Sequence, residues 1–391
     1  MKNQPPHPLT LVLILVLVLD GCTGDSAREQ ETRTNSPEGN SKVEHWEKTH
    51  PEHARLFSIE YKKDAKIVRI KNPFDTTRAL KTYLLVKEGV RPGTNLPEGQ
   101  MIRIPVQKVA LAYATHVGFF KELGLLDRVN GISQKKYIKN KQVIKAVKEK
   151  RIKEFGPSHH INTEKLLQVG PELLFVAPFK DNRYEKIRDL GIPIAINSSY
   201  METTPLARAE WIKFISYFFN RERKARQIFD SVAHHYQQLT RKVEHKKDPP
   251  TIFSGKKIGQ TWYVPGGNSY MASFFKDAGA RYLWEDNRQS GSLPLDFETV
   301  FYRASDADFW CIKENFKHRY TYAQLGSENV HYSEFDAFQN RQIIFCNTHS
   351  SPYYEEGILE PNVILADLIN ILHPGLLSGH RNKYYQLLNE E

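Results

Sequence analysis

Apolar residues recur at helical spacing through residues 204–243, and the rest of the chain is arranged on either side of this segment. Successive apolar positions are three, four or seven residues apart, which keeps them on one face of a helix. Thr204-Pro205 is typical of a helix start, and Asp248-Pro249-Pro250 is typical of a stop. The pattern predicts one helix over residues 204–246 that connects two lobes, although an ordinary long core helix has the same periodicity. Asn220-Arg221-Glu222 interrupts the apolar face with polar residues, and either a bend or a cap midway along the helix fits this position.

Shorter apolar runs alternate with amphipathic segments before and after this helix. Residues 109–112 and 173–177 are entirely apolar, which is typical of strands buried on both faces of a parallel sheet. The alternation predicts an α/β fold with two α/β lobes, each a parallel sheet flanked by helices. The other expected strands are 129–133, 192–196, 251–253, 260–264, 307–312 and 341–346, and the expected helices are 117–126, 141–149, 161–167, 184–190, 269–278, 361–372 and 384–388.

Residues 56–105 follow a period of two instead, which indicates strands with one buried face. Residues 57–61, 67–70 and 80–86 are expected to be antiparallel strands, and residues 102–105 a further short strand. This segment therefore looks like a β addition to the first lobe.

The N-terminus carries an eleven-residue aliphatic run, Leu9 to Leu19, which is too short to span a bilayer but fits the apolar part of a secretory signal. Leu19-Asp20-Gly21-Cys22 follows and resembles the lipobox of bacterial lipoproteins, which implies lipidation of Cys22. The alternatives are an uncleaved anchor and a plain signal peptide. The sequence thus predicts a signal peptide (1–21), a disordered tether (22–50), a first lobe with the β segment (51–203), the connecting helix (204–246) and a second lobe (247–391).

The formal charge is +10, but the lysines are dispersed and no nucleic-acid motif is present, so a solvated basic surface is the simpler interpretation. Cys311 and Cys346 each end an apolar run, which predicts two buried free thiols, with a disulfide as the alternative. Metal-ligand spacing such as C-x-x-C is absent, as are the zinc-protease, serine-hydrolase and phosphate-loop motifs. No cofactor and no catalytic residue is predicted.

Four stretches together resemble the helical-backbone substrate-binding proteins of ABC importers for iron complexes and cobalamin. They are Ala110 to His116 with Leu123 to Ile132, Gly156 to Leu174, Pro205 to Trp211, and Val264 to Tyr270 with Phe274 to Ala280. The resemblance implies two lobes joined by one rigid helix, with little closure and a ligand cleft between them. It also implies a siderophore, haem or cobalamin ligand, a membrane permease as partner, a place in the periplasm or cell envelope, and no enzymatic activity.

Ligand-facing groups lie past the carboxyl ends of strands in parallel α/β sheets. This rule selects a set of candidate ligand-binding residues: Thr115, His116, Tyr137, Ser158, His160, Trp262, Tyr263, Gly267, Asn268, Ser269, Arg288, Ser290 and Tyr353. The Gly267 turn at a helix start is expected to offer free backbone N–H groups to an anion. Several of these residues have a plain structural alternative: Thr115 as a helix cap, His116 and His160 as loop histidines, and one of Trp262 and Tyr263 as a core residue.

The resemblance further implies that one exposed glutamate on each lobe pairs with permease arginines. Analogous placement selects Glu185 on the first lobe and Glu328 or Glu334 on the second. Two other classes of function remain open at this stage. One is a two-lobed chelatase acting on a metal tetrapyrrole, for which His116 and His160 are the available bases, and the other is a surface interaction lipoprotein.

Overall fold

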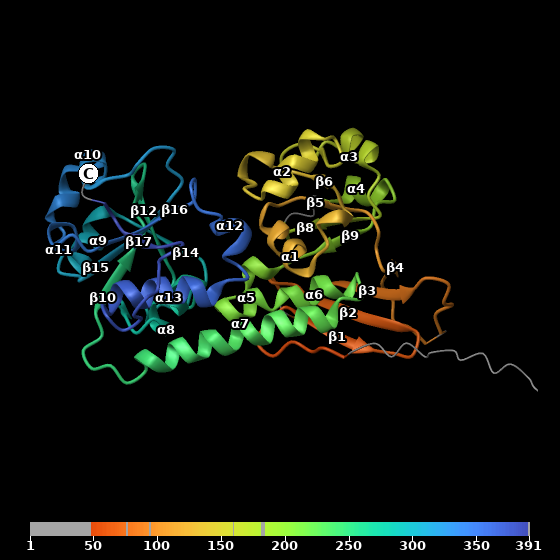
Figure 1. Cartoon of the computed structure of the whole chain (residues 1–391), viewed down its shortest axis with the longest axis horizontal. Coiled ribbons are helices and arrows are strands. Elements are labelled where there is room, and N and C mark those ends of the chain that lie inside the picture. Colours follow the sequence, from red (N-terminus) through yellow and green to blue (C-terminus); the bar gives the residue numbers. More distant parts are fainter. Residues whose placement is uncertain (1–47, 76, 94, 159, 181–183, 390–391) are drawn as a thin grey trace, which may run out of the picture. The chain divides into compact units, whose positions relative to one another are not determined.

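The computed structural model describes residues 48–389, apart from residues 76, 94, 159 and 181–183. The Leu9–Leu19 run and Cys22 therefore lie outside the described residues. Within the described ranges, none of the helices has the length and apolar character needed to cross a membrane. The described chain forms an N-terminal sheet and two α/β lobes, with a long helix running along both lobes (Figure 1).

The N-terminal sheet has the strand order β1-β2-β3-β4. Its strands are β1 (Phe57–Tyr61), β2 (Ala65–Lys71), β3 (Ala79–Lys87) and β4 (Gln100–Ile104). The first three pair antiparallel, as the period of two predicted, whereas β4 pairs parallel to β3. The sheet packs on the first lobe through Tyr83, whose ring contacts Phe214 and Phe218 and whose hydroxyl accepts the N–H of Ile196.

The first lobe is a five-stranded parallel sheet in the order β7-β6-β5-β8-β9, as the alternation predicted. Asn140 and Asn162 cap two of its helices with their side-chain oxygens, and Gly124 and Gly170 end two with a left-handed conformation. Its elements are β5 (Val109–Leu111), α1 (Thr115–Leu123), η1 (Leu126–Arg128), β6 (Val129–Ile132), η2 (Lys135–Tyr137), α2 (Lys141–Lys148), β7 (Lys153–Glu154), α3 (Thr163–Val169), β8 (Leu173–Val176), α4 (Glu185–Asp189), β9 (Ile194–Ile196) and η3 (Ser199–Met201).

The second lobe holds a five-stranded sheet in the order β13-β10-β15-β16-β17 and a smaller antiparallel sheet in the order β11-β12-β14. The strands of the larger sheet run parallel except for β17. Its strands are β10 (Thr251–Ser254), β11 (Lys257–Ile258), β12 (Thr261–Pro265), β13 (Arg281–Tyr282), β14 (Ser292–Leu295), β15 (Phe309–Glu314), β16 (Ile343–Asn347) and β17 (Gln386–Leu387). Its helices are α8 (Tyr270–Asp277), α9 (Phe297–Ala304), α10 (Tyr322–Glu328), η4 (Val330–Glu334), α11 (Asp336–Gln339), α12 (Tyr353–Glu356) and α13 (Pro361–Leu372).

The prediction of a helix at residues 384–388 is wrong, because this segment is extended and contains β17. The buried carboxylate of Asp367 accepts the backbone N–H groups of Lys383, Tyr384 and Tyr385. The segment then pairs antiparallel with β16, with Gln386 opposite Phe345 and Leu387 opposite Ile344, so its backbone belongs to a sheet. The extended backbone places Tyr385 against the rest of the second lobe, where its side chain helps to line a cavity.

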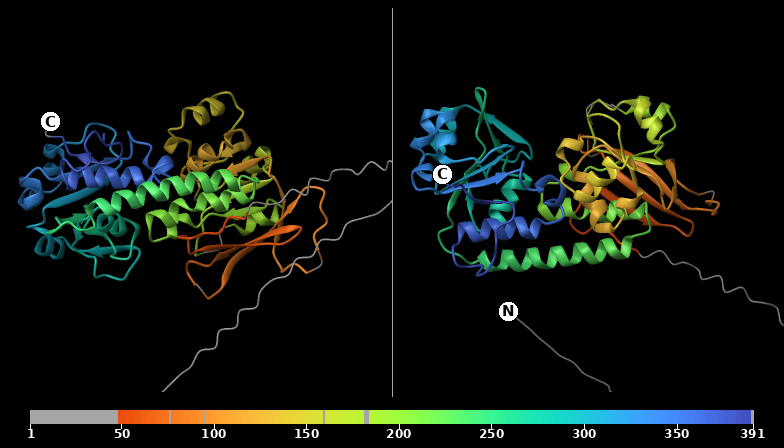
Figure 2. Two further views of the ribbon diagram at one scale, coloured as in Figure 1. Left: turned by 60° about the horizontal axis from the view of Figure 1, so that its bottom comes forward. Right: turned by 45° about the horizontal axis from the view of Figure 1, so that its top comes forward.

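The predicted long helix is present as α7 (Glu222–Val243), but the prediction of one unbroken helix over residues 204–246 is wrong, because α5 (Pro205–Ala209) and α6 (Trp211–Tyr217) precede α7 as separate helices. The helix is interrupted between α6 and α7 at Asn220-Arg221-Glu222, where Asn220 adopts a left-handed conformation with φ of 53°. The buried Lys66 of β2 fills the break: its ammonium donates to the Tyr217 carbonyl and to Asn220 Oδ1 and pairs with Glu222. The 22-residue α7 remains continuous along both lobes (Figures 1 and 2).

Two buried glutamates join the start of the described chain to α5 and α6. Glu210 accepts the backbone N–H groups of Glu52, His53 and Ala54, each at 2.7 Å. Glu202 accepts the backbone N–H groups of residues 55 and 56 and the indole N–H of Trp211. Charge-assisted hydrogen bonds of this kind are stronger than neutral ones, so the segment before β1 is firmly held against the helices that carry the functional site.

Candidate functional site

Two adjoining cavities lie at the carboxyl ends of the parallel strands. The first, here called the inter-lobe cavity, has a volume of about 620 Å³ and takes residues from both lobes. The first lobe supplies Tyr113, Ala114, Thr115, Gln134, Lys136 and Tyr137, and the second lobe supplies Asn315 and Tyr354. Three tyrosine rings thus face this space, together with one cation.

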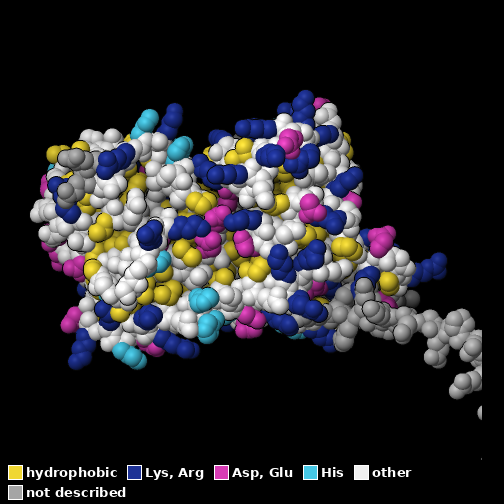
Figure 3. Space-filling view, viewed as in Figure 1, with side chains coloured by type: hydrophobic (Ala, Val, Ile, Leu, Met, Phe, Trp, Pro, Cys, Tyr) yellow, Lys and Arg dark blue, Asp and Glu magenta, His cyan; other side chains and the backbone are white. Residues whose placement is uncertain are grey.

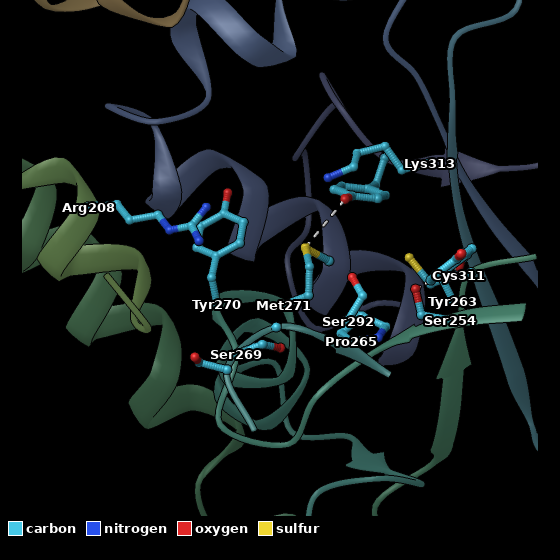
Figure 4. A pocket seen from close by; sticks show the side chains of 14 residues that line it. Arg208, Ser254, Tyr263, Pro265, Ser269, Tyr270, Met271, Ser292, Cys311 and Lys313 are labelled. Carbon is cyan, nitrogen blue, oxygen red and sulfur yellow. Dashed lines mark hydrogen bonds between the residues drawn. The ribbon is translucent and has the colours of Figure 1, made fainter. Parts of the chain in front are cut away.

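The second cavity, here called the Arg208 cavity, has a volume of about 290 Å³ and is formed by α5 and the second lobe (Figure 4). It adjoins the inter-lobe cavity, because the Lys313 ammonium in its wall lies 6.0 Å from the centre of the Tyr354 ring. Its lining includes Arg208, Ser254, Tyr263, Ser269, Tyr270, Met271, Ser290, Ser292, Cys311, Lys313 and Tyr385.

Arg208 is held in one orientation on α5. Its Nε donates to the Glu202 carbonyl at 2.9 Å and its Nη2 donates to the Tyr200 carbonyl at 2.6 Å. The guanidinium also lies over the Tyr270 ring, with Cζ 3.9 Å from the ring centre. Throughout residues 48–389, as far as they are described, Arg208 has no carboxylate within 4.0 Å. The cation is therefore fixed in place while its charge remains unneutralised.

Lys313 is the second cation of this cavity and lies near the end of β15. Its ammonium lies 4.8 Å from the centre of the Tyr353 ring, and the described residues offer it no carboxylate within 4.0 Å either. The side chain is accessible to solvent, yet the surrounding protein displaces enough water to lower the pKa of the amine. Figure 4 shows the cationic ends of Arg208 and Lys313 pointing toward each other across Tyr270. An anion between them would have two positively charged partners.

The turn at Gly267 differs from the expectation that its backbone N–H groups are free. The N–H of Asn268 donates to the Gln289 carbonyl, and the N–H of Ser269 donates to the Gly266 carbonyl. A Cβ at Gly267 would lie 2.3 Å from the Asn287 carbonyl oxygen, so glycine is required by the close approach of the loop at residues 284–289. Ser269 itself caps α8 and lines the Arg208 cavity.

The structure brings some of the predicted residues into the cavities and leaves others outside them. Thr115 and Tyr137 line the inter-lobe cavity, and Tyr263, Ser269 and Ser290 line the Arg208 cavity. Thr115 makes no capping hydrogen bond. The predicted residues that line neither cavity are His116, Ser158, His160, Trp262, Gly267, Asn268, Arg288 and Tyr353.

Most of the residues outside the cavities have an evident structural place. His116 is buried between the rings of Tyr113 and Phe175, and burial lowers its pKa to about 3. Trp262 is buried and donates its indole N–H to the Ser254 carbonyl, whereas its neighbour Tyr263 is exposed, as alternation along a strand requires.

The other predicted residues outside the cavities have different environments: Ser158, Tyr353, His160 and Arg288. The Ser158 hydroxyl accepts a hydrogen bond from Gln134, so Ser158 positions a cavity residue. Tyr353 is buried beside the Arg208 cavity, with its hydroxyl 3.3 Å from that of Tyr270. His160 and Arg288 are exposed.

Sequence reasoning missed Arg208, Lys313, Asn315, Gln134, Tyr270 and Tyr354. Lys313 and Asn315 follow the same rule as the predicted residues, because they stand at the carboxyl end of β15. Arg208 gave no such signal, since it lies inside the helical pattern and not at the end of a strand.

The candidate docking glutamates are all exposed. Glu185 is the first residue of α4 and lies 3.8 Å from Arg188. Glu328 accepts hydrogen bonds from Lys256 and Tyr320, and Glu334 lies 2.7 Å from Nδ1 of His331. Glu328 is thus already engaged within the second lobe.

The two cysteines of the described chain are free and buried, as predicted. Burial raises the pKa of both thiols, so they stay protonated. Within the same residues, no group of three or more His, Cys, Asp or Glu side chains is arranged to hold a metal ion.

Comparison with known proteins places this chain in a class of binding proteins. A family model described as periplasmic binding protein matches residues 109–349, and the chain belongs to that family, whose members bind and transport substrates rather than act as enzymes. An uncharacterized lipoprotein of Methanocaldococcus jannaschii is 28% identical over 307 residues, covering 75% of this chain and 71% of that protein. A second uncharacterized lipoprotein of the same organism is 26% identical over 318 residues, covering 78% of this chain and 79% of that protein.

Solved structures share the fold at low identity. A periplasmic heme-binding protein from Pseudomonas aeruginosa matches with a TM-score of 0.55 and 17% identity, over 69% of this chain and 94% of that one. The periplasmic vitamin B12-binding protein of Vibrio cholerae matches with a TM-score of 0.51 and 14% identity, over 68% and 97%. The two-lobed architecture with its long helix is thus that of the family.

Proposed function

We propose that this chain is a lipid-anchored substrate-binding protein of an ABC transporter that captures an anionic iron chelate and delivers it to a membrane permease. The observation that carries the proposal is the pair of cations, Arg208 and Lys313, that enter one cavity without a carboxylate partner in the described chain. Structural neighbours that bind heme, vitamin B12 or a ferric siderophore support the class of ligand.

The charge of the cavity favours one part of that ligand class. The surrounding protein displaces part of the water from both cations and lowers the pKa of each, so leaving them without anions is costly. Charge-assisted hydrogen bonds to a ligand carboxylate or catecholate would offset that cost. Haem carries two carboxylates, and many ferric siderophores carry a net negative charge. The side chains at the edge of cobalamin are mostly neutral amides. We therefore favour an iron chelate, either haem or a ferric siderophore, over cobalamin.

The aromatic walls suit a ligand of this kind. Tyr113, Tyr137 and Tyr354 line the inter-lobe cavity and Tyr263 lines the Arg208 cavity. Tyrosines present a flat apolar face together with a polar hydroxyl, so they can contact both the rings and the oxygen atoms of a chelate. Because the chelator already satisfies the metal, the protein needs only to recognise the outside of the complex.

The connection between the lobes favours a small movement on binding. Since α7 is continuous for 22 residues and contains neither glycine nor proline, bending it would break backbone hydrogen bonds. We expect the free and loaded forms to differ little in lobe angle. Solution scattering would contradict this expectation if ligand addition produced a large contraction.

The anchor and the domain boundaries remain those expected from the sequence. We propose a signal peptide over residues 1–21, lipidation at Cys22 and a tether to residue 50, followed by the first lobe (51–203), the connecting segment (204–246) and the second lobe (247–391). The two lipoprotein relatives support lipidation. Membrane fractionation of Cys22→Ser tests it, because an unlipidated chain should leave the membrane fraction.

Docking on the permease is proposed for one glutamate on each lobe. Glu185 is the candidate on the first lobe. Glu334 is preferred to Glu328 on the second, because Lys256 and Tyr320 already hold the Glu328 carboxylate. In Figure 1, α4, which begins at Glu185, lies on the side of its lobe away from α7, and so does α10, which ends at Glu328 and is followed directly by η4 with Glu334. One partner could therefore reach both lobes on that side.

The visible spectrum of the protein purified from its native membranes tests the proposal. Haem and ferric chelates are coloured, so we expect an absorption band and an equimolar amount of iron. A colourless protein that takes up none of hemin, a ferric catecholate, a ferric hydroxamate and cyanocobalamin would overturn the proposal.

A further inference from the structure

The short helix α12 lies between the two lobes and belongs to the second (Figure 1). Two of its four side chains serve the cavities: Tyr354 lines the inter-lobe cavity, and the Tyr353 ring lies beneath the Lys313 ammonium. The other two, Glu355 and Glu356, contact the first lobe. This helix therefore touches the candidate ligand site and the facing lobe at the same time.

Glu355 makes the central contact with the first lobe. Its Oε2 accepts the backbone N–H of Lys139 at 2.7 Å, and its Oε1 accepts that of Asn140 at 3.3 Å. The side chain is buried, with 3% exposed, and burial raises the pKa of the carboxyl group while the two N–H groups act in the opposite direction. A buried acceptor with two backbone donors defines one geometry of the chain around it.

A close backbone contact and an ion-pair chain support the same junction. A Cβ added at Gly118 of α1 would lie 1.7 Å from the Glu355 carbonyl oxygen, so the backbones of α1 and α12 touch directly. Lys121 of α1 pairs with Glu356 at 2.8 Å, and Lys383 pairs with Glu356 at 2.8 Å. Figure 3 shows acidic and basic side chains gathered between the lobes on this face.

The junction fixes the distance between two walls of the inter-lobe cavity. Tyr354 directly precedes Glu355 in the second lobe, and Tyr137 lies two residues before Lys139 in the first lobe. Both tyrosines line the same cavity. The hydrogen bonds of Glu355 therefore lie within a few residues of each wall.

We propose that Glu355 is a positioning residue that sets the width of the inter-lobe cavity and thereby the size of chelate that the protein accepts. The inference rests on the proposed function, and it identifies the width of the inter-lobe cavity as the property that selects the ligand. Glu355 itself need not touch the ligand, because it acts through the placement of Tyr354 relative to Tyr137.

Four variants separate positioning from general stability. Glu355→Ala removes both acceptors, whereas Glu355→Gln keeps one oxygen that can accept an N–H. Gly118→Ala pushes α12 away from α1 without changing any cavity side chain. Glu360→Ala is the matched control, because Glu360 lies close by in sequence but contacts Lys383 and Tyr384 of its own lobe.

Two readouts follow these variants in the full chain. The first is the distance distribution between spin labels at Gln142→Cys on α2 and Gln324→Cys on α10, both exposed positions. The second is the ratio of the dissociation constants for hemin and a ferric hydroxamate, two probes of different shape. Every labelled protein carries Cys22→Ser, and the native Cys311 and Cys346, which are buried and have a raised thiol pKa, should not take up the label.

We expect Glu355→Ala and Gly118→Ala to broaden the distance distribution and to change the affinity ratio by about tenfold or more. Glu355→Gln should keep much of the narrow distribution, and Glu360→Ala should leave both readouts unchanged. An unchanged distribution in Glu355→Ala and Gly118→Ala, or an equal loss of affinity for both probes, would overturn the inference. If the wild-type protein binds neither probe, the proposed function fails for these ligands, while the distance measurement still decides the role of Glu355.

Discussion

The guanidinium carbon of Arg208 lies 3.9 Å from the centre of the Tyr270 ring, and this stacked pair forms one side of the candidate ligand site. Two backbone carbonyls hold Nε and Nη2, so the remaining N–H groups are available to the cavity. Burial raises the pKa of Tyr270, which therefore stays neutral beside the cation. The arrangement presents a positive charge that is already oriented before a ligand arrives, which reduces the entropic cost of binding.

Removal of either cavity cation should weaken the binding of an anionic chelate. We expect Arg208→Gln and Lys313→Met each to lower affinity by about 10- to 100-fold, since a hydrogen bond to a charged group contributes roughly 1.5–3 kcal/mol. Isothermal titration with hemin measures the effect. Lys256→Met is the control, because the Lys256 ammonium already pairs with Glu314 and Glu328. Equal affinity in wild-type and both cavity variants would remove these cations from the site.

The ion pair between Lys66 and Glu222 should stabilise the fold substantially. Both side chains are buried, and Lys66→Met would leave the Glu222 carboxylate without this cation. We expect a loss of about 3–5 kcal/mol in the free energy of unfolding, measured by denaturant titration. Lys62→Met, which removes an exposed pair with Glu60, should cost far less, because solvent screens that pair. Similar losses in the two variants would show that the buried pair is no more important than the exposed one.

The same ion pair shows how far the sequence could predict this fold. The α/β alternation, the N-terminal strands and most helix positions follow from local periodicity, because each depends on which face of an element is buried. Lys66 gave no such signal, since its partner Glu222 lies 156 residues away. The break between α6 and α7 depends on this distant lysine. The polar residues at Asn220 therefore indicated where the helix is interrupted, but they did not indicate the cause.

The candidate site was predicted in part for a similar reason. The rule of the carboxyl ends of parallel strands selected Thr115 and Tyr137, which line the inter-lobe cavity. Tyr263 also lines a cavity, but it lies within β12 of the antiparallel sheet, where that rule does not apply. The rule could not tell that His116 turns into the core, because a helix turns successive side chains in different directions. Arg208 required knowledge of the tertiary packing of α5, which local sequence does not contain.

Burial of His116 should make stability depend on pH. Its pKa is about 3 in the folded chain, compared with an ordinary value of 6.5. Between these values the unfolded chain binds a proton that the folded chain does not, so stability rises with pH from about 3 to 6.5. We expect His116→Leu to reduce this slope by up to about 1.4 kcal/mol per pH unit. Denaturant titrations of both proteins at several pH values provide the test, and parallel curves would contradict it.

Charge reversal on both lobes should impair docking on the permease. We expect Glu185→Lys combined with Glu334→Lys to slow association strongly at low salt, whereas either change alone weakens docking by at most about 1 kcal/mol. Asp230→Lys combined with Glu244→Lys is the control, because it makes the same charge change on the exposed side of α7. Surface plasmon resonance with the reconstituted permease measures association.

The interpretation of that experiment depends on ligand binding, which must be intact in every variant. Transport at the wild-type rate by the Glu185 and Glu334 double variant would show that the docking assignment is wrong. A loss of association in the α7 control as well would point to a general charge effect.

Titration of the purified protein with ferric chelates of different charge tests the central claim most directly. The panel contains hemin and a ferric catecholate, which are anionic, together with a neutral ferric hydroxamate and cyanocobalamin. The unneutralised charges of Arg208 and Lys313 predict saturable equimolar binding of at least one anionic chelate, with a dissociation constant of about 1 μM or lower and weaker binding of the neutral compounds. Tighter binding of a neutral compound, or no saturable binding of any chelate by the folded protein, would contradict the account.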